Sequence, residues 1–174
     1  MMSTLQTTTE REDLLETLAK HRHFLRYTVR DLTREQATER TAASELTLAG
    51  LIKHVTAVEA NWATFILEGA PQEPPDLDDA AQFAEWRDGF QMLAGESLAG
   101  LLECYAATAR RTDEIVASVA SLDDSHALPV APWFEPGARW SARRTLLHII
   151  AETAQHAGHA DIIRESLDGA KTMG

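Results

Sequence analysis

The sequence has a single cysteine, few aromatic side chains and no long apolar run. One cysteine, Cys104, excludes an internal disulfide and is typical of proteins from a reducing compartment. Its neighbours repeat at helical spacing, which predicts that it is a small buried hydrophobe. No apolar stretch approaches the roughly 20 residues that a membrane-spanning helix needs, and the N-terminal residues lack the pattern of a secretory signal. We therefore expect a cytoplasmic protein with no membrane partner.

Basic residues are also scarce. The chain has 16 lysines and arginines against 27 acidic residues, a formal charge of −11. This balance argues against nucleic acid as a partner, because the phosphate backbone is bound by clustered positive charge. The length of 174 residues fits one domain. We expect residues 1–174 to form it, with a core from about residue 10 to residue 169.

Apolar residues recur at helical spacing in four long stretches. These stretches run from Thr9 to Asp31, from Thr47 to Glu68, from Ser97 to Leu122, and from Ser141 to Gly169. Thr9 and Glu12 are placed like a capping box, and Ser141 and Gly169 suit the two ends of the last helix. Four amphipathic helices predict a bundle.

The segments between these helices are shorter or irregular. Leu32 to Glu39 predicts one short helical turn, and Asp78 to Gly95 a short helix before the third long one. Ser121 to Arg139 contains three prolines and is nearly structureless by propensity, and no stretch predicts a convincing strand. The expected fold is therefore all-α, a four-helix bundle with a long loop before the last helix.

The last helix carries three histidines and a glutamate on one side. At about 100° per residue these four side chains fall within an arc of about 80°. They are His148, Glu152, His156 and His159. Isoleucines on the same stripe turn it toward an apolar interior. Burying several imidazoles and a carboxylate without partners is costly, and a bound cation removes that cost, so the cluster predicts a metal site.

In a bundle, metal ligands come from facing helices. The inward row of the second long helix contains His54, so His54 with Glu152 and His156 satisfies this rule. The spacing does not exclude His148 or His159 as ligands. A hydrogen-bonded core cluster without a metal is the plain alternative. In the preceding loop, Trp133 and Phe134 are candidates to line the mouth of a pocket, although packing alone also explains such aromatics.

Two segments carry a resemblance to a known family. The histidine in LTLAGLIKHVTAVEANW and the motif EtAqHaGHaDiiRE near the C-terminus resemble the DinB/YfiT-like superfamily of metal-binding four-helix bundles. The branch is related to the metal-binding domain of mycothiol-dependent maleylpyruvate isomerase. The resemblance covers about residues 10 to 169.

The resemblance implies a divalent metal, commonly zinc or nickel, with His54, Glu152 and His156 as ligands. His148 and His159 would then lie behind the ligands or line the pocket. It also suggests a low-molecular-weight thiol such as mycothiol as cosubstrate. The isomerase has a further C-terminal domain that contributes to its active site. We expect no counterpart of that domain within these 174 residues, so isomerisation is not carried over.

Several functions remain open at this stage. The first is a metal-dependent transferase that joins a thiol to a small electrophilic molecule. The alternatives are a metal-dependent hydrolase, a non-catalytic metal-containing binding or stress module, and a non-haem iron site with two histidines and one carboxylate. The partner we expect is a small-molecule substrate, and fold analogy alone points to a homodimer.

Overall fold

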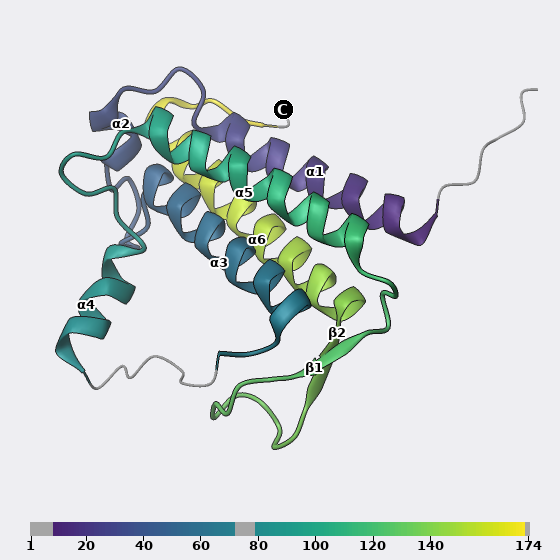
Figure 1. Cartoon of the computed structure of the whole chain (residues 1–174). Helices are drawn as coiled ribbons and strands as arrows, with labels where there is room; N and C mark the ends of the chain where they lie inside the picture. Colours follow the sequence, from purple (N-terminus) through teal and green to yellow (C-terminus); the bar gives the residue numbers. More distant parts are fainter. Residues whose placement is uncertain (1–8, 72–78, 173–174) are drawn as a thin grey trace, which may run out of the picture.

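Four long helices dominate the computed structural model, which describes residues 9–71 and 79–172 (Figure 1). They are α1 (Glu10–Thr28), α3 (Leu48–Glu68), α5 (Leu98–Ser118) and α6 (Ala142–Asp168). Two short helices, α2 (Arg34–Thr38) and α4 (Ala80–Asp88), lie between them. The predicted bundle of four amphipathic helices is confirmed. Among the described helices, none is both long enough and apolar enough to cross a bilayer.

The helix ends follow the sequence signals. Thr9 and Glu12 form a reciprocal capping box at the start of α1, in which each side chain bonds the other residue's backbone N–H. Ser141 accepts a hydrogen bond from the backbone N–H of Arg144 at the start of α6. Gly169 ends that helix with φ 78°, a left-handed conformation that suits glycine.

Packing places α6 between two partners. It lies against α1 on one side and α3 on the other, and α3 also packs against α5. Two groups of buried side chains fill the interior, one including Leu25, Leu51 and Tyr105, the other including Leu18 and Ile149. The ligand-bearing helices of the sequence prediction, α3 and α6, are therefore direct neighbours.

Cys104 departs from its prediction. It is exposed on α5, although Leu101 and Tyr105 on the same helix are buried. Cys104 lies one residue before Tyr105, which is about 100° around the helix, so burying the Leu101 and Tyr105 row turns the thiol outward. The expectation of a buried hydrophobe at this position was wrong.

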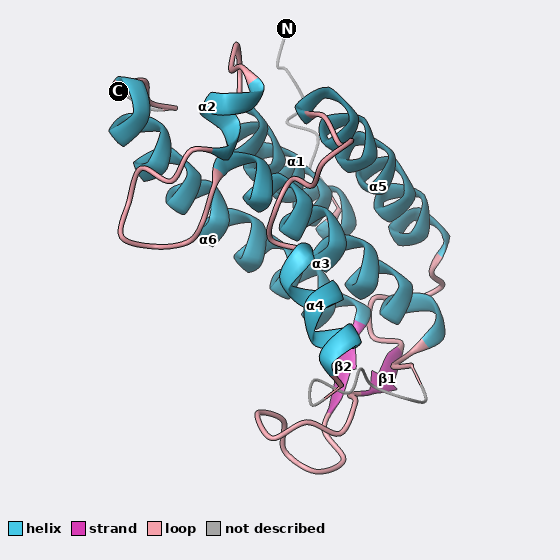
Figure 2. Ribbon diagram, turned by 90° about the vertical axis from the view of Figure 1, so that its left-hand side faces the viewer, coloured by secondary structure: helices cyan, strands magenta, loops and turns pink. Residues whose placement is uncertain are grey.

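The prediction of no strands was also wrong. β1 (Ser125–Ala127) pairs in an antiparallel ladder with β2 (Arg139–Ser141), with His126 opposite Trp140 (Figure 2). Strands of three residues are too short to show an alternating pattern. The hairpin pairs two parts of the segment between α5 and α6, and it places Trp140 just before the start of α6. It places an aromatic side chain near the histidines of that helix.

As predicted, a short helix precedes the long helix α5. The short helix is α4, while Asp78 lies outside the described residues. The turn after α4 then returns to α3 so closely that a Cβ on Gly50 would stand 2.1 Å from the backbone oxygen of Phe90. Gly50 thus permits a close backbone approach that brings Phe90 onto α3.

Candidate metal centre

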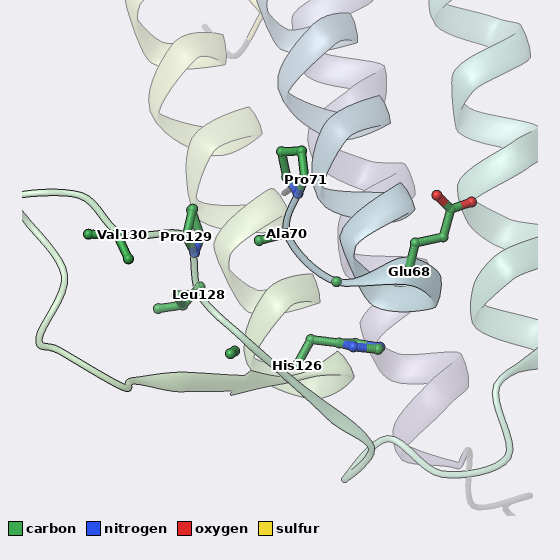
Figure 3. Close-up of a pocket in the computed structure, with 9 residues that line it drawn as sticks. Glu68, Ala70, Pro71, His126, Leu128, Pro129 and Val130 are labelled. Carbon is green, nitrogen blue, oxygen red and sulfur yellow. The ribbon is translucent and has the colours of Figure 1, made fainter. Parts of the chain in front are cut away.

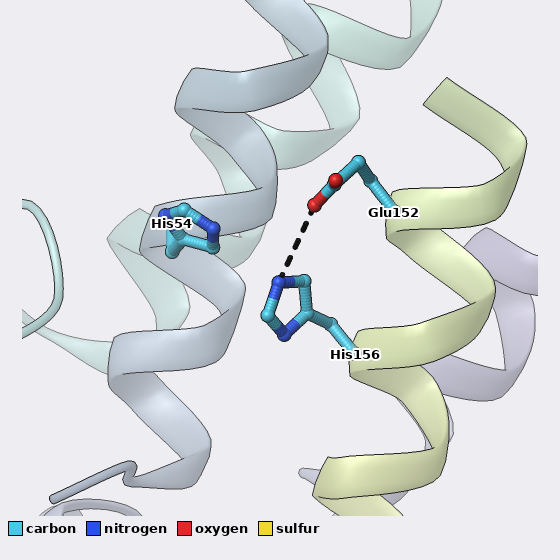
Figure 4. A group of neighbouring side chains, drawn as sticks. All are labelled: His54, Glu152 and His156. Carbon is cyan, nitrogen blue, oxygen red and sulfur yellow. Dashed lines mark ion pairs between the residues drawn. The ribbon is translucent and has the colours of Figure 1, made fainter. Parts of the chain in front are cut away.

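Two neighbouring helices supply the three predicted ligands (Figure 4). His54 lies on α3, and Glu152 and His156 lie one turn apart on α6. Each offers one nitrogen or oxygen atom, and these atoms all lie within 4.8 Å of one another. Figure 4 shows the side chains meeting in the gap between the two helices. The structure therefore brings together the three side chains that the sequence analysis selected.

The local geometry is set mainly by His156. Its Nε2 atom lies 3.5 Å from Oε2 of Glu152, and its ring meets the ring of His54 edge to face, with 4.9 Å between centroids. The side chains of Glu152 and His156 are 29 % and 13 % exposed. The cluster therefore sits at the border of the core and can be reached from solvent, rather than deep within the core as its apolar stripe suggested.

His54 is held in place by an aromatic ring. Phe90 stacks on its imidazole with 4.3 Å between centroids and an interplanar angle of 21°. Partial burial lowers the pKa of His54 below its ordinary value, His156 lowers it further, and Glu152 opposes both effects. Its imidazole is therefore neutral at pH 7 and keeps a lone pair for bonding to a cation.

His156 is in a similar state. Burial lowers its pKa, which the carboxylate of Glu152 partly counteracts, while His159 adds to the lowering. Two neutral imidazoles and one carboxylate form a donor set suited to zinc or another divalent transition metal. The residues present fit the metal that the sequence predicted.

The two flanking histidines approach different ligands. His148 Nε2 lies 3.9 Å from Oε1 of Glu152, and His159 Nδ1 lies 3.4 Å from Nδ1 of His156. If His156 donates its Nδ1–H to His159, its Nε2 keeps the free lone pair on the side of Glu152. His148 thus lies beside Glu152, and His159 lies beside His156.

The loop aromatics differ in their distance from the cluster. Phe134 packs against Trp140, with 5.6 Å between ring centroids, and Trp140 in turn contacts His148. Trp133 contacts Phe134 at 6.2 Å and is 72 % exposed, so it lies at the outer end of this group.

Three neighbours of the cluster were not anticipated. Trp62 and Trp140 both meet the ring of His148 edge to face, at 4.9 and 5.0 Å. Trp62 follows His54 by eight residues, about 80° around the helix, so both belong to one broad helical stripe and spacing could have identified it. Phe90 comes from an irregular segment, where no periodic signal exists.

A separate hollow lies at the end of α3 (Figure 3). It has a volume of about 380 Å³ and is lined by the end of α3, the residues after it, and the chain from His126 to Val130. His126 packs against Phe65 and close to Gly69. The three clustered side chains do not line this hollow.

Comparisons with known proteins agree with this architecture. The crystal structure of a conserved protein from Enterococcus faecalis is similar, with a TM-score of 0.68 and 15 % sequence identity, over 94 % of this chain and 100 % of that one. At this identity the likeness shows the fold alone. No curated protein matches the chain.

The sequence comparison is more specific. The profile of the mycothiol-S-transferase family matches residues 13–169, which include α3, α6 and the hairpin between α5 and α6. The match extends over most of the chain, in agreement with the DinB/YfiT-like resemblance and the observed bundle. The chain therefore belongs to the mycothiol-S-transferase family.

Proposed function

We propose that this protein is a metal-dependent S-transferase that joins mycothiol, or a similar low-molecular-weight thiol, to a small electrophilic molecule. Membership in the mycothiol-S-transferase family supports the thiol. The observation that carries the metal requirement is the meeting of His54, Glu152 and His156 between α3 and α6. The proposal concerns one domain formed by residues 1–174.

His54, Glu152 and His156 are the proposed ligands of a divalent cation, zinc or nickel. At bond lengths of about 2.0–2.1 Å, two donors of one ion lie at most about 4.2 Å apart. The donor atoms here lie within 4.8 Å, so small side-chain rotations suffice. Three protein donors also leave at least one position for a non-protein ligand, the pattern of a catalytic site.

A divalent cation held by His54, Glu152 and His156 would lower the pKa of a thiol and so supply a thiolate nucleophile at neutral pH. The residues around it hold the cluster in shape. Phe90 fixes the ring of His54, and His159 orients His156. Burial lowers the pKa of His148, so this imidazole is neutral at pH 7 and is placed to accept the proton that a thiol releases.

The test compares the parent protein with His156→Ala, both purified without an affinity tag. We expect the variant to lose most of its zinc or nickel, measured by elemental analysis, and at least tenfold in thiol consumption with mycothiol and an acrylamide. It should also lose the rise in melting temperature that added metal gives the parent, because a ligand that binds the folded state stabilises it.

His23→Ala is the matched control, since His23 is exposed on α1 and belongs to no part of the cluster. It should keep metal and activity. Equal metal content in His156→Ala and the parent would contradict the ligand assignment. Thiol consumption no faster with metal-loaded than with metal-free parent would contradict the transferase.

A further inference from the structure

The tryptophans of this chain gather around the candidate centre. The sequence has four, and each is linked through ring contacts either to His54 or to His148, which lies beside Glu152. Trp62 and Trp140 touch His148 directly. Trp133 is connected to Trp140 through Phe134, and Trp86 is connected to His54 through Phe90. In a chain with 6 % aromatic residues, this is a marked concentration at one site.

The aromatic rings next to β2 pack mainly against one another and against Arg144. Trp62 stacks on the ring of Trp140 at 4.9 Å, and the guanidinium of Arg144 lies over Trp140 at 4.2 Å from the centroid. Phe134 meets an edge of the same indole. Little aromatic surface near the centre remains free on this side, where Trp133 alone of the group is strongly exposed.

The group on α4 is different. Phe83 stacks on Trp86 at 5.7 Å, and Trp86 meets Phe90 edge to face at 5.0 Å. We call these three rings the aromatic strip. Phe83 and Trp86 are 46 % and 52 % exposed, although each could bury a large area in a core. At its inner end, Phe90 stacks on His54, so the strip leads from solvent to a proposed ligand.

Packing of α4 against the other described elements does not account for the exposed positions of Phe83 and Trp86. α4 makes little contact with the other described elements, and Figure 1 shows it standing apart from the four long helices. Exposed apolar patches of this kind mark binding sites. Because the strip is continuous with His54, a flat molecule lying on Trp86 would reach toward the half-exposed centre.

We infer that the aromatic strip binds a planar aromatic ring of the electrophilic substrate. This inference rests on the proposed transferase and specifies its substrate class. A ring stacked on Trp86, next to Phe90, would hold the electrophilic carbon near the thiol. The preference for aromatic electrophiles comes from Phe83, Trp86 and Phe90, while the thiol chemistry depends on His54, Glu152 and His156.

The experiment uses two electrophiles with the same reactive group, N-phenylacrylamide and N-methylacrylamide. In both, the thiol sulfur bonds to the terminal alkene carbon, the C=C π bond breaks, and the thiol proton ends on the adjacent carbon, with no leaving group. Each catalysed rate is divided by the uncatalysed rate of the same acrylamide. We expect kcat/KM to favour the phenyl compound about tenfold, mainly through KM.

Trp86→Ala should remove this preference, measured as the ratio of kcat/KM for the two acrylamides in the same variant. Trp86→Phe, which keeps an aromatic ring, should retain most of it. Trp133→Ala is the control, because it removes another exposed indole, 72 % exposed against 52 % for Trp86, that lies outside the strip. An unchanged phenyl preference in Trp86→Ala, or its loss only in Trp133→Ala, would overturn the inference.

A binding measurement separates this inference from the proposed function. N-Phenylpropanamide and N-methylpropanamide lack the alkene and cannot react, so calorimetry measures their binding alone. Tighter binding of the phenyl compound to the parent, lost in Trp86→Ala, supports the strip even if no thiol is consumed. Equal binding of both amides refutes the strip even if the enzyme transfers thiols.

The strip could instead be an interface with a second copy of this chain. Sedimentation of the parent and Trp86→Ala tests this alternative. A concentration-dependent dimer that Trp86→Ala abolishes, together with no phenyl preference in the parent, would overturn the inference in favour of such an interface.

Discussion

Arg22 and Glu59 form an ion pair in the interior, between α1 and α3. Both carboxylate oxygens of Glu59 accept hydrogen bonds from the guanidinium, and the Glu59 side chain has no exposed surface. Asp113 on α5 is a second partner, 2.9 Å from Arg22. Leaving one member of a buried pair without its partner is far more costly than losing a surface pair.

Glu59→Gln should therefore lower the free energy of unfolding by about 3 kcal/mol, because it leaves the half-exposed Asp113 as the charged partner of a buried guanidinium. Chemical denaturation measures the change. Glu96→Gln is the comparison, since Glu96 pairs with Lys53 near the surface and should cost about 1 kcal/mol or less. Similar losses in the two variants would show that the buried pair has no special weight.

Tyr105 has a buried hydroxyl that faces Thr153 without forming a well-aligned hydrogen bond to any described residue. Burial raises the pKa of this phenol above its ordinary value, and the charge of Glu59 raises it further. Below pH 10 the group is protonated in both the folded and the unfolded state. Above pH 10 the unfolded state loses its proton first, so stability falls as the pH rises.

The free energy of unfolding of the parent should drop by about 1 kcal/mol per pH unit above pH 10 relative to that of Tyr105→Phe. Denaturation of both proteins between pH 9 and 11.5 measures this difference, which cancels the titration of lysines. Parallel profiles for parent and Tyr105→Phe would argue against a buried, protonated phenol.

The contact between α3 and the turn after α4 depends on one glycine. A Cβ on Gly50 would approach the backbone oxygen of Phe90 to 2.1 Å, closer than atoms can pack, so the turn would have to move. Because Phe90 stacks on His54, this movement would also disturb the candidate centre. The position of the turn after α4 therefore affects the orientation of the His54 ring on α3.

Gly50→Ala should lower the free energy of unfolding by about 1–3 kcal/mol, the usual effect of overpacking, and weaken metal binding. Gly158→Ala is the matched control on α6. Its Cβ would meet no atom within 4 Å, so the change should stabilise the protein by up to about 1 kcal/mol through helix propensity. Denaturation and metal titration of both variants measure these effects. Stabilisation of both would contradict the close approach.

At the scale of the whole molecule, α6 connects α1, α3, the hairpin and the candidate metal centre. It packs against α1 and α3 at once, and it follows directly from the hairpin that carries Trp140. Near its C-terminal end, Arg164 donates hydrogen bonds to the backbone oxygens of Thr28 and Arg30, just beyond the turn that ends α1. The same helix thus supplies two clustered side chains and an anchor for α1. The homodimer expected from fold analogy stays a prediction.

Local sequence alone was enough to predict some features of the structure. Capping residues predicted the start of α1 and both ends of α6, and the apolar periodicity predicted the four long helices. Arg22 and Glu59 were missed, although each occupies a row of apolar residues at helical spacing, Leu18 and Leu25 beside Arg22, Val55 and Ala63 beside Glu59. Two opposite charges at such positions are a signal for a buried pair, but only packing decides whether they meet.

The sequence by itself determined the helices and the neighbourhood of Glu152 and His156, because residues four apart on one helix always share a face. Only the tertiary structure decided that His54 joins them, that the cluster stays half exposed, and that Phe90 and the hairpin bring aromatic rings to it. These outcomes depend on contacts between residues far apart in the chain. Such contacts follow from the packing of whole helices and turns, which no local spacing encodes.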